Sequence, residues 1–343
     1  MKKLLNTLYV TTENAYASLD GENIVVSVEK EELGRFPLHI LEGIYLFSYS
    51  GASPALMGKC VRENINLVFL TPRGRFLARA CGESNGNVLL RKEQYRISDD
   101  PFRSAILARG FLFGKLYNSR QVLARARRDH GERIDETAFL RAEECLQEAL
   151  AKLLDETTLE GLRGLEGAAA NHYFSRLDDM ILRNKGEFYY HERSRRPPLD
   201  NVNALLSFVY TLLSNDCASA AESAGLDSYV GFLHRDKPGR TSLALDLVEE
   251  LRPCLADRFV LTLINDRVVT TEDFQKQENG AVLLTDVGRK KLQKEWQSRK
   301  QTKIMHPYLQ EKIEWGLIPY VQALLLARCI RGDLDGYPPF LWK

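Results

Sequence analysis

The chain has 343 residues, a length that suggests two or three domains with a sizeable buried core. Hydrophobic residues make up 44% of the sequence and charged residues 27%, which is close to the average of soluble globular proteins and excludes disordered, collagen-like and low-complexity classes. Because 47 Lys and Arg balance 46 Asp and Glu, the formal net charge of +1 favours neither an acidic nor a basic partner.

The sequence contains no candidate membrane anchor. Its longest apolar stretches, 204–213 and 317–327, run for about ten residues, whereas a spanning helix needs about twenty. The first residues also lack an apolar segment long enough for a signal peptide, so we expect a cytoplasmic protein. The six cysteines are too far apart for zinc-type spacing, and we expect reduced thiols.

Residues 1–85 are predicted to form a β-rich domain. Apolar residues alternate over 15–19 and 24–28 around Asp20-Gly21, which is typical of a β-hairpin. Further elements are expected as strands at 38–47, 65–70 and 75–80, a turn at 72–74, and a short helix over 54–62 that Ser53 can cap. Short strands with regular turns favour a small sandwich or barrel.

The apolar spacing becomes helical from residue 99, after a linker predicted over 86–98. We expect helices over 101–128, 136–154, 159–183, 201–214, 242–251, 286–300 and 308–330. A strand-rich domain followed by a helical domain over 99–343 is the segregated α+β pattern.

The neutral total charge conceals several charged blocks. Residues 91–133 hold 11 basic and 5 acidic side chains, whereas 135–160 hold 2 basic and 8 acidic. Residues 183–196 combine 5 basic side chains with Phe188, Tyr189 and Tyr190. Basic runs with aromatic residues suit a nucleic-acid backbone, although solvated helix faces balanced by acidic neighbours would give the same pattern.

Glu166 is the first candidate for chemistry. On a helix it falls within a stripe of apolar residues that includes Leu162, Ala169 and Tyr173. A buried carboxylate needs a cation, and either an arginine or a metal ion would serve. The alternative to a functional site is an ordinary buried Glu–Arg pair.

A second group of polar residues lies in a loop and in the helix that follows it. His234 occupies the loop over 231–240, and Asp246 and Glu249 stand one turn apart on the helix over 242–251, so that both can point at one place. Two carboxylates and one imidazole suit Mg²⁺ or Mn²⁺, and Arg235 with its basic neighbours Lys237 and Arg240 could hold phosphate oxygens. The alternatives are a satisfied surface histidine and an acidic solvent face, of which Glu250 would be a part.

Several segments together resemble a known family. They are LRGLEGAAAN at 162–171, RPPLDNVNALLSFVYTLL at 196–213, GLDSYVGFLH at 225–234, RTSLALDLVEELRP at 240–253 and YPPFLWK at 337–343. They resemble the CRISPR-associated adaptation integrase, the first of the two core spacer-acquisition proteins, called Cas-one here. The tail and the histidine loop look most like the subtype I-C branch.

The resemblance implies a β-sandwich N-terminal domain, through which the protein dimerises, and an all-helical C-terminal nuclease–integrase domain that binds Mg²⁺ or Mn²⁺. The family's metal ligands fall on Glu166, His234 and Glu249, and Asp246 is a supporting catalytic residue. Ser228 and Thr241 replace prolines expected in relatives, which affects loop stiffness alone. The DNA-binding candidates are Arg195, Arg196, Tyr210, Tyr229, Arg235 and Arg240.

The activity implied by the resemblance is attack of a prespacer 3′-OH on a phosphodiester at an end of the CRISPR repeat. The implied partners are prespacer and repeat DNA, a second copy of the chain, a small ferredoxin-fold protein called Cas-two, and an iron–sulfur adaptation nuclease. His234 could be a metal ligand or could protonate the leaving oxygen. Two other functions are considered, a non-catalytic DNA-binding scaffold and a metal-dependent phosphohydrolase acting on small phosphate esters.

Overall fold

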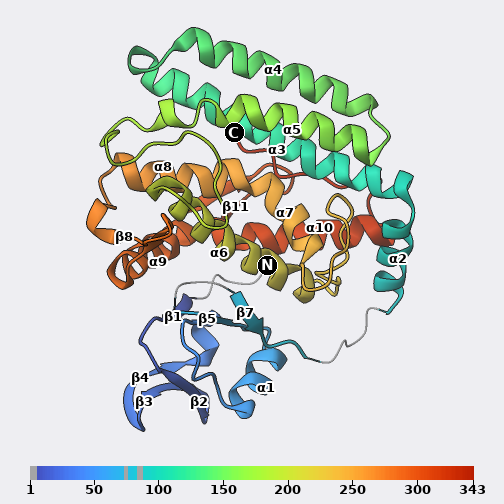
Figure 1. Cartoon of the computed structure of the whole chain (residues 1–343). Helices are drawn as coiled ribbons and strands as arrows, with labels where there is room; N and C mark the ends of the chain where they lie inside the picture. The colour runs from blue at the N-terminus through green and yellow to red at the C-terminus, as the bar shows by residue number, and fades with distance from the viewer. Residues whose placement is uncertain (1–5, 73–75, 83–87) are drawn as a thin grey trace.

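The computed structural model describes residues 6–72, 76–82 and 88–343. A strand-rich N-terminal part lies beneath a larger and mostly helical part (Figure 1). This arrangement confirms the predicted α+β class. Among the described residues, no helix combines the length and the apolar character needed to cross a membrane.

The N-terminal part contains two sheets. The larger has the order β1-β5-β6-β7 and the smaller the order β2-β3-β4. The bounds of these strands are Asn6–Val10, Leu41–Leu46, Asn66–Leu70 and Phe76–Arg79 in the larger sheet, and Tyr16–Asp20, Asn23–Val28 and Glu31–Pro37 in the smaller. Buried side chains from both sheets, such as Ile24 and Ile44, share one core with helix α1, Pro54–Arg62.

The predicted hairpin around Asp20-Gly21 is confirmed, because β2 pairs antiparallel with β3 and Gly21 has a φ of +58°. Ser53 caps α1 by accepting a hydrogen bond from the backbone of Leu56, as expected. The sequence did not predict β1 and β4, nor the parallel pairing of β5 with β1 and β6. The turn expected at 72–74 lies partly outside the described residues.

The seven helices predicted from residue 99 onward are all present, six of them with shifted ends. Their bounds are α3 Pro101–His130, α4 Glu136–Asp155, α5 Leu159–Phe174, α6 Asn201–Ser223, α7 Ser242–Leu251, α9 Asp286–Gln301 and α10 Ile318–Arg331. Helix α8, Arg258–Asn265, was not predicted. The helix expected over 159–183 ends at Phe174, although apolar spacing continues, because the following turn buries Leu177 and Ile181 in the same core.

The expectation of an all-helical C-terminal domain is wrong. Two antiparallel hairpins interrupt it, β8 Phe274–Lys276 with β9 Val282–Leu284, and β10 Lys303–His306 with β11 Glu311–Glu314. The second hairpin occupies the start of the helix predicted over 308–330. That helix begins at Ile318, where Pro319 takes a first-turn position in which its missing N–H is not needed.

Helix α2, Val88–Asp99, fills most of the range predicted as a linker. Its polar composition conceals a narrow buried stripe of Leu90, Gln94 and Ile97, which packs against α3 and α10. Residues 86 and 87 of the predicted linker lie outside the described residues.

Helix α3 packs against both α5 and α7, and these three helices position the candidate site (Figure 1). Two glycines permit close approach. A Cβ at Gly114 of α3 would lie 2.8 Å from the Cβ of Glu250 on α7, and a Cβ at Gly231 would lie 2.9 Å from the backbone carbon of Ser242. Larger residues at either place would therefore separate the elements that carry the polar side chains.

Candidate functional site

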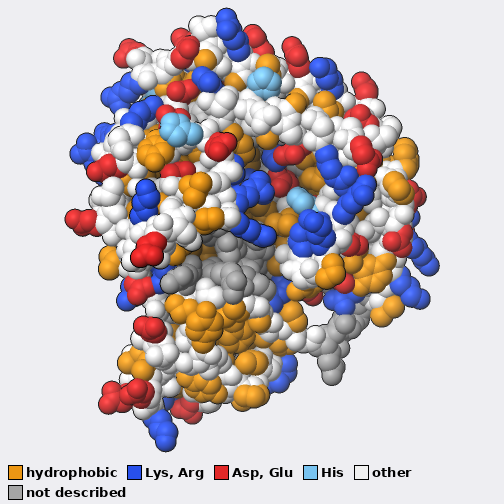
Figure 2. Space-filling model, viewed as in Figure 1, with side chains coloured by type: hydrophobic (Ala, Val, Ile, Leu, Met, Phe, Trp, Pro, Cys, Tyr) orange, Lys and Arg blue, Asp and Glu red, His pale blue; other side chains and the backbone are white. Residues whose placement is uncertain are grey.

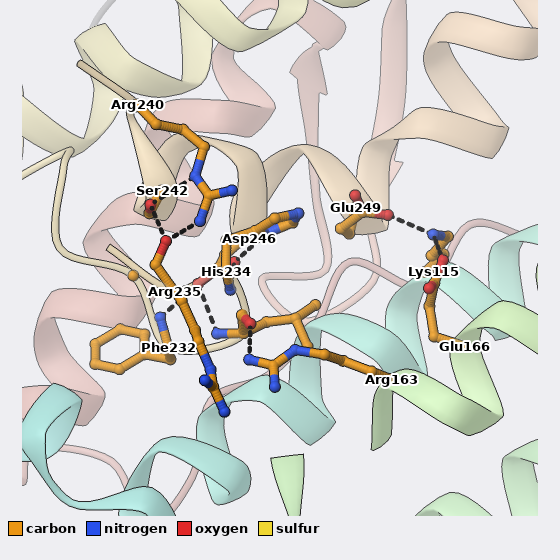
Figure 3. A network of polar contacts seen from close by, with 12 residues as sticks. Lys115, Arg163, Glu166, Phe232, His234, Arg235, Arg240, Ser242, Asp246 and Glu249 are labelled. Carbon is orange, nitrogen blue, oxygen red and sulfur yellow. Dashed lines mark hydrogen bonds and ion pairs between the residues drawn. The ribbon is translucent and has the colours of Figure 1, made fainter. Parts of the chain in front are cut away.

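The structure brings the four predicted catalytic residues into two adjoining polar clusters (Figure 3). In the first cluster, Asp246 of α7 binds the loop that carries His234. In the second, Glu249 of α7 and Glu166 of α5 both contact the ammonium group of Lys115 from α3. Helices α3 and α5, and α7 with the loop that precedes it, therefore supply the site from three separate parts of the sequence.

Asp246 is fully buried and holds the histidine loop in place. Its carboxylate accepts hydrogen bonds from the backbone N–H groups of Phe232 (2.7 Å), Leu233 (3.1 Å) and His234 (3.0 Å). The Nδ1 atom of His234 lies 2.6 Å from Asp246 Oδ1. Because this carboxylate already accepts three hydrogen bonds, Nδ1 carries the proton and donates it, which leaves the Nε2 lone pair of His234 for a ligand or a proton.

Glu249 is buried between two cations. Its Oε1 lies 2.9 Å from the guanidinium of Arg252, and its Oε2 lies 2.6 Å from Lys115 Nζ. Burial alone would raise its pKa, but Arg252, Lys115 and then His234 lower the pKa of Glu249 to about 2. Glu249 is therefore a carboxylate at any working pH, as a metal ligand must be.

Glu166 is partly exposed, and its Oε1 contacts the same Lys115 ammonium. The expectation that Glu166 is buried is wrong, since its side chain is partly exposed, but it does contact a cation, which is a lysine rather than the arginine considered. Lys115 was not singled out from the sequence. The only signal for it was its place in a run of apolar and small residues, FLFGKL at 111–116.

The expectation that Asp246 and Glu249 point at one place is wrong. Asp246 is committed to the loop, whereas Glu249 faces Lys115 and Arg252. One turn along α7 thus separates a side chain that orients His234 from one that faces a cation.

The side chains of Glu166, Glu249 and His234 are of types that suit a hard divalent cation, but their present arrangement suits it only in part. Glu166 and Glu249 converge on one positive charge, the Lys115 ammonium, and His234 is held by Asp246 of α7, the helix that also carries Glu249. Carboxylate oxygens with one imidazole nitrogen suit Mg²⁺ or Mn²⁺. Within the described ranges, no three Asp, Glu, His or Cys side chains lie close enough together to hold an ion, and the ammonium of Lys115 contacts both carboxylates.

The interpretation of Glu250 as part of an acidic solvent face is wrong. Its side chain is fully buried and accepts hydrogen bonds from the Tyr337 hydroxyl, from Gln322 Nε2 and from the Phe340 backbone N–H at 2.8 Å. Burial raises the pKa of Glu250 to about 7, and among the described residues no cation faces it to offset this. The C-terminal tail therefore covers this side of α7.

Four of the six predicted DNA-binding residues line one cavity of about 350 Å³. We call it the arginine cavity, and its charged or aromatic lining residues are Arg79, Arg193, Arg195, Arg196, Arg252, Tyr210 and Tyr229. No Asp or Glu appears among the described residues that line it. Figure 2 shows Lys and Arg side chains gathered around a hollow of the helical part.

The six candidates differ in their availability. Arg195 and Arg196 are exposed, whereas the Tyr210 hydroxyl donates a hydrogen bond of 2.5 Å to Asp257 and its ring lies under Arg193 and Arg252. Tyr210 therefore supports the cavity wall and has no free hydroxyl.

Arg235 and Arg240 lie outside the arginine cavity. The side chain of Arg235 binds Glu160 at 2.8 Å, and that of Arg240 contacts the carbonyl oxygen of Arg235. Arg240 therefore braces the histidine loop.

Residues 8–298 match the family described as CRISPR associated protein Cas1. The chain belongs to the Cas1 family. It is 49% identical over the full length of both chains to CRISPR-associated endonuclease Cas1 1 of Chlorobaculum tepidum and to CRISPR-associated endonuclease Cas1 2 of Rhodospirillum rubrum. It is also 34% identical over 339 residues to a CRISPR-associated exonuclease Cas4/endonuclease Cas1 fusion of Geobacter sulfurreducens, covering 98% of this chain and 60% of the fusion.

Solved structures share the Cas1 fold. A casposase bound to integration product has a TM-score of 0.83 at 22% identity, covering 99% of this chain and 95% of the casposase. A chain of a Cas6-RT-Cas1–Cas2 complex has a TM-score of 0.80 at 21% identity, covering all of this chain and 36% of that chain. At such identities the likeness is one of fold, and it agrees with the strand-rich and helical parts described above.

Proposed function

We propose that this member of the Cas1 family is a metal-dependent DNA endonuclease and integrase. It joins the 3′-OH of a prespacer to a phosphodiester at the end of a CRISPR repeat. The observation that carries the proposal is the convergence of Glu166 and Glu249 on the Lys115 ammonium, with His234 held by Asp246 of the helix that carries Glu249. The names of the full-length relatives as endonucleases support it.

Each polar side chain has a role in this proposal. Glu166, Glu249 and the Nε2 atom of His234 would hold Mg²⁺ or Mn²⁺, which when bound polarises the scissile phosphate and stabilises charge on the attacking and leaving oxygens. Asp246 fixes the ring of His234 through Nδ1 and orients Nε2. Arg252 holds Glu249 from the side opposite Lys115 and also lines the arginine cavity.

The arginine cavity is suited to the DNA backbone. Arg79, Arg193, Asn215 and Arg252 line it, and each keeps a buried donor nitrogen without a hydrogen-bond partner among the described residues. Buried donors without partners are costly, and phosphate oxygens would satisfy them. Arg195 and Arg196 add exposed positive charge at its mouth.

We further propose three protein partners. The first is a second copy of this chain, bound through the N-terminal part, where Leu33 and Phe36 of strand β4 are exposed at the edge of the smaller sheet. The second is a dimer of Cas2, a protein that forms a complex with the Cas1 fold in the solved Cas6-RT-Cas1–Cas2 assembly. The third is an iron–sulfur nuclease, since a relative is fused to the exonuclease Cas4.

Assignment to subtype I-C also remains a proposal. It rests on the resemblance of the histidine loop at 225–234 and of the tail at 337–343.

A strand-transfer assay with Glu166→Gln and His234→Ala tests the catalytic proposal, with thermal melting to confirm that both variants fold. We expect both to lose integration and nuclease activity and to retain DNA binding. Full activity in either variant would contradict the metal site. If wild-type protein binds DNA but never joins strands in the presence of Mn²⁺, the chain is instead a non-catalytic scaffold.

A further inference from the structure

Lys115 is a buried lysine in an unusual position. It comes from the middle of α3, its side chain is 7% exposed, and its ammonium contacts Glu166 Oε1 and lies 2.6 Å from Glu249 Oε2. Burial of a lysine is unfavourable unless carboxylates compensate its charge. Here the compensating carboxylates are the two that the proposed function assigns to the metal.

The ammonium and a divalent cation cannot share this place. An ion bound by Glu166 and Glu249 must approach the oxygens that now face Lys115 Nζ, and two cations so close would repel each other strongly. Without any cation, the two carboxylates that now face Lys115 would repel each other across the site. The lysine therefore does electrostatically what the metal would do.

We propose that Lys115 is a placeholder that keeps Glu166 and Glu249 assembled without metal and that a divalent cation must displace. The inference rests on the proposed function of these carboxylates. Competition with a resident ammonium lowers the apparent affinity for the ion, so Lys115 sets the metal concentration at which the site becomes loaded. The flexible four-carbon stem lets the released ammonium move without any shift of α3.

The molecule contains a matched control for this lysine. Lys300 on α9 is also buried, with 4% of its side chain exposed, and also bridges two carboxylates, Glu42 at 2.9 Å and Asp216 at 3.5 Å. Its carboxylates lie between the two parts of the chain, where the Tyr45 hydroxyl also binds Asp216. We assign no ion to this pair of carboxylates.

Direct Mn²⁺ titration, followed by electron paramagnetic resonance, tests the proposal on wild type, Lys115→Met, Lys300→Met and Glu249→Gln. Methionine keeps the length of the lysine stem and removes its charge. We expect Lys115→Met to bind Mn²⁺ at least about tenfold more tightly than wild type, which corresponds to about 1.4 kcal/mol. Lys300→Met should bind as wild type does. Without metal, both lysine variants should melt at a lower temperature than wild type. Added Mn²⁺ should restore the melting temperature of Lys115→Met but not that of Lys300→Met.

The outcomes separate the two claims. If Glu249→Gln no longer binds Mn²⁺ but Lys115→Met binds it no more tightly than wild type, the placeholder role of Lys115 is wrong and the proposed metal site is still supported. If Glu249→Gln binds Mn²⁺ as wild type does, or if neither wild type nor Lys115→Met binds it, the metal site is wrong and the placeholder with it. Should Lys115→Met fail to fold, Lys115→Gln, which retains hydrogen-bond donors without charge, gives the same comparison.

Discussion

Glu249 and Glu250 are neighbours on α7 and both are buried, yet their environments shift their pKa values in opposite directions. Glu249 lies between Arg252 and Lys115, which hold its pKa at about 2 against the effect of burial. Glu250 accepts hydrogen bonds from the C-terminal tail and faces no cation in the described part of the chain, and burial raises its pKa to about 7. Burial alone therefore does not identify a functional carboxylate, and the charge of the groups facing it is more informative.

The largest expected effect comes from removing the charge of each glutamate in turn. Glu249→Gln should reduce strand transfer by at least about a hundredfold, with no recovery at any Mn²⁺ concentration, because a ligand to the metal is lost. Glu250→Gln should remain within a few-fold of wild type. Integration assays over a range of Mn²⁺ concentrations measure both variants. Equal activity of the two would contradict the different roles assigned to Glu249 and Glu250.

The second prediction concerns stability against pH. The folded-state pKa of Glu250, about 7, lies above its ordinary value of 4.5, so its contribution to stability is fully present below about pH 4.5 and is lost as pH rises through 7. The loss amounts to about 3 kcal/mol over that range. Urea unfolding of wild type and Glu250→Gln between pH 5 and pH 8 measures it. Parallel curves would show that Glu250 keeps an ordinary pKa in the folded protein.

A smaller effect is expected at Asp246, which orients His234 without facing the cation. Asp246→Asn should lower strand transfer by about 10–100-fold, and higher Mn²⁺ should restore part of the activity. The same Mn²⁺ series that is used for Glu249→Gln checks this. If Asp246→Asn is inactive throughout while Glu249→Gln is rescued, the roles of the two residues are reversed.

The smallest effect is expected at the mouth of the arginine cavity. Replacing Arg195 and Arg196 together with alanine should weaken DNA binding on all sequences alike, and should flatten the log–log dependence of affinity on salt by about one to two units. Filter binding or fluorescence anisotropy from low to high salt measures the slope. An unchanged slope would assign both arginines to the solvated surface.

Local signals were enough to predict the helices of the site but not the directions of their side chains. The helices that carry Glu166, Asp246 and Glu249 are present, whereas Asp246 and Glu249 face different partners despite their i, i+3 spacing. The hairpin around Asp20-Gly21 and the cap at Ser53 are similarly local. For these features a few residues of sequence carry the decisive information.

Features that depend on tertiary approach could not be predicted in the same way. Lys115 meets Glu166 and Glu249 only because α3 packs against α5 and α7, and no periodicity within α3 reports that contact. Glu250 resembled a solvent-facing residue because its partners Tyr337 and Phe340 come from the distant tail. The β10–β11 hairpin was not predicted, because its apolar residues fit the helical spacing of the segment that follows.

The central claim is that Glu166, Glu249 and His234 form one site for a divalent cation. Anomalous scattering from a crystal of the protein soaked in Mn²⁺ tests it most directly. We predict one strong peak bonded to a carboxylate oxygen of Glu166, to a carboxylate oxygen of Glu249 and to Nε2 of His234, with the Lys115 ammonium moved away. A peak elsewhere, or Lys115 still bridging the two carboxylates while Mn²⁺ is bound at saturating concentration, would contradict it.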